Sequence, residues 1–191
     1  MGPRPSTHDT CTIGGMIGNN SCGASAQAYG KMVDSVVRLG VLTCDGLRMW
    51  VGETSREEYE RIIAEGGRRA EIYRALRDLR DEDMELIRAR HPDIPRRVSG
   101  YNLDSLLPEK GFDVARALVG SEGTLVAVLR AEIRLVPVPA FGSLAVLGYD
   151  GIAEAGDAVP RVRRRARSRW RAWTSGSSAW PSATTSPRPA W

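Results

Sequence analysis

The sequence predicts an α+β fold with a mainly antiparallel sheet, flanking helices and a helical insert. Two β-rich stretches on either side of Asp45-Gly46 predict a hairpin. Apolar residues at helical spacing among many charged residues predict a helical insert over about residues 53–97, and an alternating apolar pattern beginning at Thr124 predicts a long strand. The 191 residues give room for one ordinary domain, or for part of a larger one.

The opening stretch CTIGGMIGNNSCGASAQAYGK, from Cys11 to Lys31, contains five glycines and two adjacent asparagines. Glycine and asparagine weaken helices and strands alike, so we expect an irregular loop. Because glycine has no Cβ and accepts positive φ, consecutive N–H groups can converge on an anion. Gly14-Gly15, the run from Gly18 to Ser21, and Gly23 suit a diphosphate, which has many acceptor oxygens. A plain glycine-rich surface loop explains the same composition, and neither a G-x-G-x-x-G nor a Walker A motif is present.

The hairpin is the clearest local signal. Val36 to Leu42 is rich in β-formers, Asp45-Gly46 suits the positive φ of a tight turn, and Leu47 to Val51 returns as the second strand. In the insert, Ser55 and Glu58 have the spacing of a capping box and predict the start of a helix.

A longer helix is expected from about Arg69 to His91, with a charged face that is most simply a solvated surface. Phe112 to Val119 predicts a short helix that leads into Gly120-Ser121-Glu122-Gly123. The strand from Thr124 to Val138 is expected to end at its prolines. The residues predicted to share one face of this strand are Leu125, Ala127, Leu129, Ala131, Ile133 and Leu135. LAVLGYD, residues 144–150, allows one more strand.

The charge is unevenly distributed. Residues 161–191 hold eight of the 27 Arg and Lys residues and no acidic residue, which leaves 19 basic against 23 acidic residues in 1–160, a net charge of −4. This arginine- and tryptophan-rich segment lacks the aliphatic residues that offset the entropy of ordering. We expect residues 151–191 to be a disordered basic tail, or the translation of a shifted reading frame. A nucleic-acid-binding arm with interleaved aromatics is the alternative.

The remaining composition is that of a globular protein without a targeting segment. No apolar run approaches the ~20 residues that a membrane span requires, and the N-terminus has no signal-peptide core. Cys11, Cys22 and Cys44 are too dispersed for a metal or iron–sulfur site, which favours reduced thiols and a cytoplasmic location.

Four motifs in a fixed order carry a family resemblance. They are GGMIGNNSCG…YG, the hairpin VVRLGVLTCDG, GYNLDSLL…GFDVARALVGSEGTL, and the alternating strand. This order resembles the FAD-binding domain of FAD-linked oxidases related to vanillyl-alcohol oxidase, with D-lactate, glycolate and D-2-hydroxyglutarate dehydrogenases the nearest. The helical insert is similar to large members that carry a fused iron–sulfur domain. The resemblance implies that residues 1–150 are part of a PCMH-type FAD-binding domain, namely its second subdomain.

In that family FAD lies extended between two subdomains, and backbone amides hold its diphosphate. The resemblance implies cofactor contacts from Gly14, Gly15, Gly18, Asn19, Asn20, Ser21 and Gly23, support from Tyr29 and Gly30, a second block at Glu122, Gly123 and Thr124, and adenine-side contacts from Val126 and Val128. Two alternatives stay open: Tyr29 as a core aromatic, and Glu122 as a carboxylate that caps nearby amides. Tyr101 and Asn102 are expected to fix a turn.

The implied activity is that of an FAD-dependent oxidoreductase acting on CH–OH donors. Hydride would pass from a D-2-hydroxy acid (lactate, glycolate or 2-hydroxyglutarate type) to flavin N5, leaving a 2-oxo acid. The family's first glycine-rich loop, its substrate domain and its catalytic and metal-binding histidines are absent from this sequence, in which His8 and His91 are the only histidines.

We therefore assign no catalytic or metal-binding residue. We expect the chain alone to be inactive and to bind FAD weakly or not at all. Its partners would be the hydroxy acid of the full-length enzyme, together with the missing N-terminal FAD subdomain and C-terminal domains. A non-enzymatic module that binds nucleic acid through the tail, or an inactive fragment, is the alternative.

Overall fold

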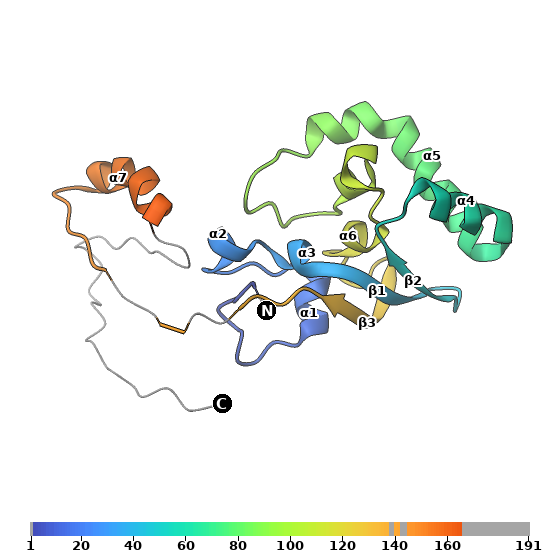
Figure 1. Ribbon diagram of the computed structural model, residues 1–191, viewed down its shortest axis with the longest axis horizontal. Coiled ribbons are helices and arrows are strands. Elements are labelled where there is room, and N and C mark those ends of the chain that lie inside the picture. Colours follow the sequence, from blue (N-terminus) through green and yellow to red (C-terminus); the bar gives the residue numbers. More distant parts are fainter. Residues whose placement is uncertain (1, 138–139, 142–144, 166–191) are drawn as a thin grey trace. The chain divides into compact units, whose positions relative to one another are not determined.

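A computed structural model describes residues 2–137, 140–141 and 145–165 of the chain (Figure 1). The chain divides into two compact units, Met1–Ala140 and Phe141–Trp191. The division falls about ten residues before the boundary that the sequence predicts at residue 150. The part of the arginine-rich tail from residue 166 onward lies outside the described residues.

The first unit is built on a three-stranded antiparallel sheet. Its strands are β1 (Val36–Thr43), β2 (Arg48–Gly52) and β3 (Val126–Ile133), in the order β2-β1-β3. The predicted hairpin is confirmed, because β1 pairs with β2 and the turn between them contains Gly46 at φ 88°. β1 is the central strand, and β2 and β3 are the edge strands.

Six α-helices and two 3-10 helices are described in the first unit. They are α1 (Ile13–Gly18), α2 (Ala26–Tyr29), α3 (Met32–Ser35), α4 (Arg56–Glu65), α5 (Gly67–Arg90), η1 (Leu103–Leu106), η2 (Pro108–Lys110) and α6 (Val114–Leu118).

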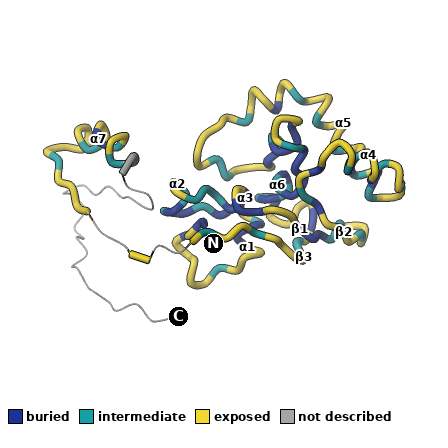
Figure 2. The backbone as a smooth tube through the Cα atoms, viewed as in Figure 1, coloured by how far each residue is buried: buried dark blue, intermediate teal, exposed yellow. Residues whose placement is uncertain are grey.

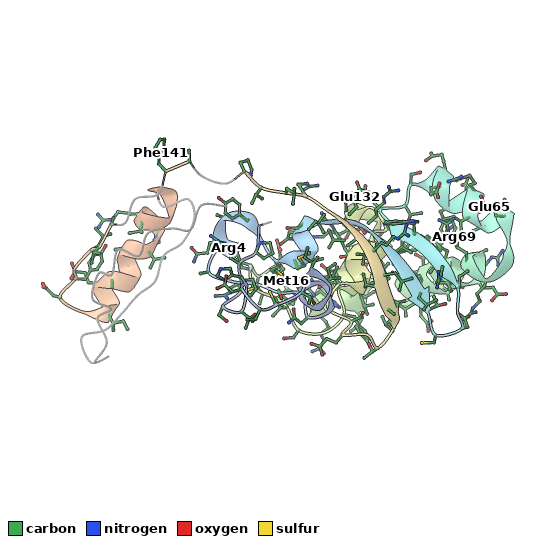
Figure 3. The ribbon with its side chains drawn as sticks, turned by 90° about the horizontal axis from the view of Figure 1, so that it is seen from below. Arg4, Met16, Glu65, Arg69, Glu132 and Phe141 are labelled. Atoms are coloured by element: carbon green, nitrogen blue, oxygen red, sulfur yellow. The ribbon has the colours of Figure 1, made fainter. Side chains whose placement is uncertain are left out.

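The predicted helical insert corresponds to α4 and α5, and both helices form where the sequence indicates. The Ser55 hydroxyl accepts a hydrogen bond from the Glu58 N–H at 3.1 Å, as expected for an N-cap. Gly66, at φ 73°, turns the chain between the two helices, and Glu65 and Arg69 lie at this turn (Figure 3) with their charged groups 3.9 Å apart.

The third strand differs from its prediction in length and in the face that it buries. β3 ends at Ile133, and its buried residue is Val126 rather than Leu125 or Leu129, which are 41% and 49% exposed. The register shifts between the Val41–Val128 and Gly40–Arg130 pairs, so one extra residue, Leu129, is inserted. A β-bulge of this kind reverses which face each residue occupies, and an alternating pattern alone does not reveal it.

The core lies between the sheet and the helices on one of its faces. In Figure 2 the buried segments concentrate along β1 and α6. α1 and α3 contribute Met16, Ile17, Met32 and Val33, β1 contributes Leu39 and Val41, and the region of α6 contributes Val114, Ala115, Ala117 and Val119. On the other face of the sheet, Arg38 pairs with Glu132 and lies over the Trp50 ring.

The second unit contains α7 (Ile152–Arg165) among its described residues, where the sequence predicts a disordered tail. A helix over this range contradicts disorder there and does not test the alternative of a shifted reading frame. Ala155, Ala158, Val159 and Val162 recur at helical spacing and are the less exposed positions of α7. Residues 145–150 form no strand, so the described part of the predicted extra strand is not formed.

Within the described residues, no helix combines the length and the apolar character needed to cross a membrane.

Candidate functional site

The glycine-rich opening forms a short helix, α1, rather than the predicted irregular loop. The Thr12 hydroxyl accepts a hydrogen bond from the Gly15 N–H at 3.0 Å and caps the first turn. Met16 and Ile17 are 2% and 1% exposed and pack in the core. Their burial, at about 2 kcal/mol each, offsets a helix cost of roughly 1 kcal/mol for each glycine. The loop prediction weighs only the glycines and so misses the two side chains that dock the helix.

The backbone amides that follow α1 close the helix. The N–H groups of Asn19, Asn20 and Ser21 donate to the carbonyl oxygens of residues 15, 17 and 16, at 3.1, 3.3 and 2.9 Å. These three amides are therefore occupied within the chain. The predicted contacts of these residues with a cofactor thus depend on their side chains, of which the Ser21 hydroxyl donates to Asn19 Oδ1 at 2.6 Å.

Asn20 holds a buried amide that is only half satisfied. Its side chain is 1% exposed, and its Oδ1 accepts a hydrogen bond from the Val33 N–H at 3.0 Å. Its Nδ2 has no acceptor among the described residues. Asn20 also adopts a left-handed conformation with φ 49°, which asparagine tolerates better than most residues. A buried donor without a partner costs about 1–3 kcal/mol, so the unpaired Asn20 Nδ2 destabilises the fold by about that amount.

The α1 segment contacts the turn that precedes β3 directly. The Gly120 N–H donates to the Ile17 carbonyl at 3.0 Å, and the Glu122 N–H donates to the Gly18 carbonyl at 3.0 Å. A side chain at Gly120 would lie 3.3 Å from the Asn20 Cβ. The two motifs, a hundred residues apart in sequence, are therefore in direct contact.

The turn of residues 120–124 has an unusual backbone conformation. Glu122 and Gly123 both have positive φ, 52° and 77°, and glutamate pays a steric cost there. The Thr124 hydroxyl donates to the Ser121 carbonyl at 2.6 Å and lies 2.8 Å from the Tyr101 hydroxyl. Among the described residues the Glu122 carboxylate makes no hydrogen bond or ion pair, so the alternative in which it caps nearby amides gains no support.

The glycines of the site fall into two classes. A methyl group at Gly14 or Gly18 would meet no other atom within 4 Å, so packing does not require glycine at either position. Gly23 is different, because a methyl group there would lie 1.9 Å from the Arg4 carbonyl oxygen. Figure 3 labels Arg4 and Met16, the latter on α1. Gly14 and Gly18 thus leave open space in front of the α1 backbone.

Tyr29 and Gly30, the predicted supports of the loop, lie at the end of α2. Gly30 has φ 73°, and a methyl group there would lie 2.4 Å from the Asp34 carboxylate, so the local fold itself requires glycine. Tyr29 is half-buried, with its Cβ close to Gly2. α3 is attached to the α1 segment by the Met32 N–H, which donates to the Ser21 carbonyl at 2.9 Å.

Val126 and Val128 turn their side chains toward the core rather than toward a ligand. Val126 is 8% exposed and pairs with Thr43, and Val128 pairs with Val41. β3 is an edge strand, so backbone groups of alternate residues face away from β1. Any contact of these two valines with a cofactor would therefore come from their backbone, as the family resemblance implies.

The structure adds a cation that the sequence does not indicate. Arg96 donates from Nε to the Cys22 sulfur at 3.2 Å, beside the start of the Cys22–Ala24 segment. The backbone N–H groups of Cys22, Gly23 and Gly123 have no acceptor in the described part of the chain. Arg96 lies 74 positions from Cys22, beyond the helical insert, and no local pattern could have predicted this contact.

Among the described residues, the ionisable side chains outside this region form no catalytic or metal cluster. No three His, Cys, Asp or Glu side chains gather in the described residues. His8 lies beside Asp9, and His91 Nδ1 lies 3.0 Å from the Ile87 carbonyl. Asp113 is buried, and desolvation raises the pKa of its carboxyl, although the Arg116 N–H and side chain oppose this.

This geometry fits the diphosphate part of a dinucleotide. It provides unpaired backbone donors, open space over two glycines and a guanidinium. Charge-assisted bonds from such donors to phosphate oxygens are stronger than neutral ones. Donors of this kind suit an anionic bridge, and the exposed Glu122 carboxylate lies in the same turn without a hydrogen bond or ion pair among the described residues.

Comparison with known proteins agrees with this chemistry. Residues 1–52 match a family described as "FAD binding domain". The chain is 32% identical to D-2-hydroxyglutarate dehydrogenase of Pseudomonas putida over 154 residues, which is 80% of this chain and 15% of that protein. It is 28% identical over 163 residues to D-lactate dehydrogenase of Archaeoglobus fulgidus, covering 85% of this chain and 25% of that protein.

A third relative is glycolate oxidase subunit GlcD of Escherichia coli, 23% identical over 157 residues, covering 82% of this chain and 21% of that protein. No solved structure matches the chain. The chain thus spans about a sixth to a quarter of the length of the relatives named here.

Proposed function

We propose that this chain, which carries part of an FAD-binding domain of the FAD-linked oxidase type, forms the second subdomain of a PCMH-type FAD-binding domain and holds the FAD diphosphate. The observation that carries the proposal is the direct contact between the α1 segment and the 120–124 turn, through the Gly120–Ile17 and Glu122–Gly18 hydrogen bonds. This contact supports a site to which both blocks contribute.

The residues of this chain bind and orient the cofactor. The free amides of Cys22, Gly23 and Gly123 donate to diphosphate oxygens, and the buried Asn20 side chain positions the α1 segment by accepting the hydrogen bond of the Val33 N–H. Arg96 balances the negative charge of the bridge. Gly14 and Gly18 let the cofactor approach the α1 backbone without a steric barrier.

The reaction of the full-length protein is the oxidation of a D-2-hydroxy acid, of the 2-hydroxyglutarate, lactate or glycolate type. The named relatives support this substrate class. FAD, when bound, would supply the two-electron acceptor: the C2 hydrogen would leave as a hydride to the flavin and the hydroxyl proton would pass to a base outside this chain, which gives the 2-oxo acid. We propose that substrate binding and the catalytic residues belong to parts of the full-length protein outside this chain, and we expect the isolated chain to be inactive.

The proposal is tested by titrating the chain against FAD and following FAD fluorescence anisotropy. About 0.3 M salt screens non-specific attraction of phosphates to the arginine-rich tail. Of weak binding and no binding, both of which the sequence allows, a diphosphate site requires weak saturable binding, with competition by ADP that is stronger than competition by AMP, because ADP retains the diphosphate. Purified protein should contain far less than one FAD per chain. Anisotropy that stays flat, or equal competition by AMP and ADP, would contradict a diphosphate site.

A further inference from the structure

One row of positions along α5 combines apolar and charged side chains, and its outer part is exposed to solvent. Its positions are separated alternately by four and three residues, which is the spacing of a coiled-coil seam. They are Ile72, Leu76, Leu79, Asp83, Leu86 and Arg90. Leu76 packs partly against the core, whereas Leu79 and Leu86 are 39% and 55% exposed. We call the outer part, Leu79, Asp83, Leu86 and Arg90, the α5 seam.

A hollow of about 360 Å³, open to solvent, lies beside the α5 seam. Its lining consists of Asp83, Leu86, Ile87, Arg90, His91 and Leu103. Three of these side chains are large and aliphatic. An exposed Leu86 next to an open apolar hollow has the shape of a knob beside a hole.

The two charges of the seam are arranged symmetrically about Leu86. Asp83 and Arg90 are seven residues apart, which places them about 10 Å from each other along the helix. Neither makes an ion pair in the part of the chain that the structure describes. By contrast, the neighbouring Arg88 pairs with Glu85 and Glu109. A two-fold axis crossing α5 near Leu86 would bring each Asp83 opposite an Arg90.

We propose that the α5 seam binds a second copy of this chain through an antiparallel α5–α5 contact. Leu86 of each copy enters the hollow of the other, and two equivalent Asp83–Arg90 pairs flank it. Such an isologous contact requires a surface that is complementary to itself, and the opposite charges on either side of a central leucine satisfy that requirement. The contact is independent of the proposed FAD site, which lies at α1 and the 120–124 turn.

The expected affinity is modest. A helix pair of two to three turns buries less than the roughly 1,200 Å² of a stable standard-size interface. We expect a dissociation constant on the order of 10–100 µM, with an antiparallel dimer that forms only at high protein concentration.

Sedimentation equilibrium of the 191-residue chain, over concentrations that bracket this range, tests the proposal. Asp83→Arg and Arg90→Asp each place like charges opposite each other in a homodimer, and each should weaken the dimer about tenfold or more. An equimolar mixture of the two variants should dimerise at least as well as the wild type, because every contact is then between opposite charges. Leu86→Ser should also weaken the dimer, while Leu129→Ser, an exposed leucine on β3, serves as the matched control.

Circular dichroism checks that each variant keeps its helices, so a loss of dimer is not a loss of fold. The decisive result is rescue by mixing, since unfolding of either variant could not produce it. A chain that stays monomeric throughout the range overturns the proposal. So does a dimer that both charge reversals leave unchanged, because another surface then forms it.

Discussion

Gly14 and Gly18 offer a test that separates a ligand role from a folding role. Both lie in α1, neither has a positive φ, and a methyl group on either would meet no atom within 4 Å. Alanine is about 0.5–1 kcal/mol more favourable than glycine in a helix interior, and less at the last helical residue. The Gly14→Ala/Gly18→Ala variant should therefore be more stable than the wild type by about 1 kcal/mol.

The increase is measurable by urea unfolding and by thermal melting. For a chain of this size, 1 kcal/mol corresponds to a rise in Tm of about 2–4 °C. Gly23→Ala should have the opposite effect, since its Cβ would meet the Arg4 carbonyl at 1.9 Å and the backbone would have to move. Overpacking of this kind typically costs about 1–3 kcal/mol.

The same double variant should lose affinity for FAD by about tenfold, because the added methyl groups occupy the space over the α1 backbone. Gly156→Ala is the matched control, because Gly156 also lies in a helix, α7, with no atom within 4 Å of a new methyl group. It should affect FAD binding little. A double variant that is more stable and binds FAD as well as the wild type would refute the ligand role of these glycines.

Three further predictions concern the site and its surroundings. Glu122→Gly should raise the free energy of unfolding by about 1 kcal/mol in urea titrations, because glycine adopts φ 52° without strain; unchanged or lower stability would mean that the glutamate side chain contributes more than its backbone costs. Asn20→Ala should lower it by about 1 kcal/mol, because the buried Val33 N–H loses its acceptor and alanine is strained at φ 49°, while removal of the unpaired Nδ2 offsets part of the loss; higher stability than that of the wild type would contradict this reasoning. Asp113→Asn should gain stability relative to the wild type as the pH rises above 3.8, because the folded state raises the pKa of Asp113 and ionisation then disfavours folding; unfolding curves at acid and neutral pH with a constant difference would exclude this effect.

Local sequence signals predicted those elements that depend on neighbouring residues. Asp45-Gly46 specified the hairpin, and Ser55 specified the start of α4, because turn geometry and helix capping involve only a few consecutive residues. The inner face of β3 could not be read in the same way. The insertion of Leu129 is a property of the pairing with β1, so the alternation gives the wrong face for Leu125 and Leu129.

The candidate site was predictable in its composition but not in its geometry. The two glycine-containing motifs were recognisable, and the structure brings them together. The helical form of Ile13–Gly18 was missed because it depends on the burial of Met16 and Ile17 against distant residues. Arg96 reaches Cys22 only after the chain has returned from the helical insert, so its position requires the tertiary fold.

The most direct test of the central claim is an amide-resolved NMR titration of the ¹⁵N-labelled chain with FAD. If the α1 segment and the 120–124 turn form one diphosphate-binding surface, the resonances of Gly14, Cys22, Gly23 and Gly123 should shift together, with one common saturation curve. Shifts limited to one of the two segments, or shifts centred on α5 or on the arginine-rich tail, would contradict a shared site.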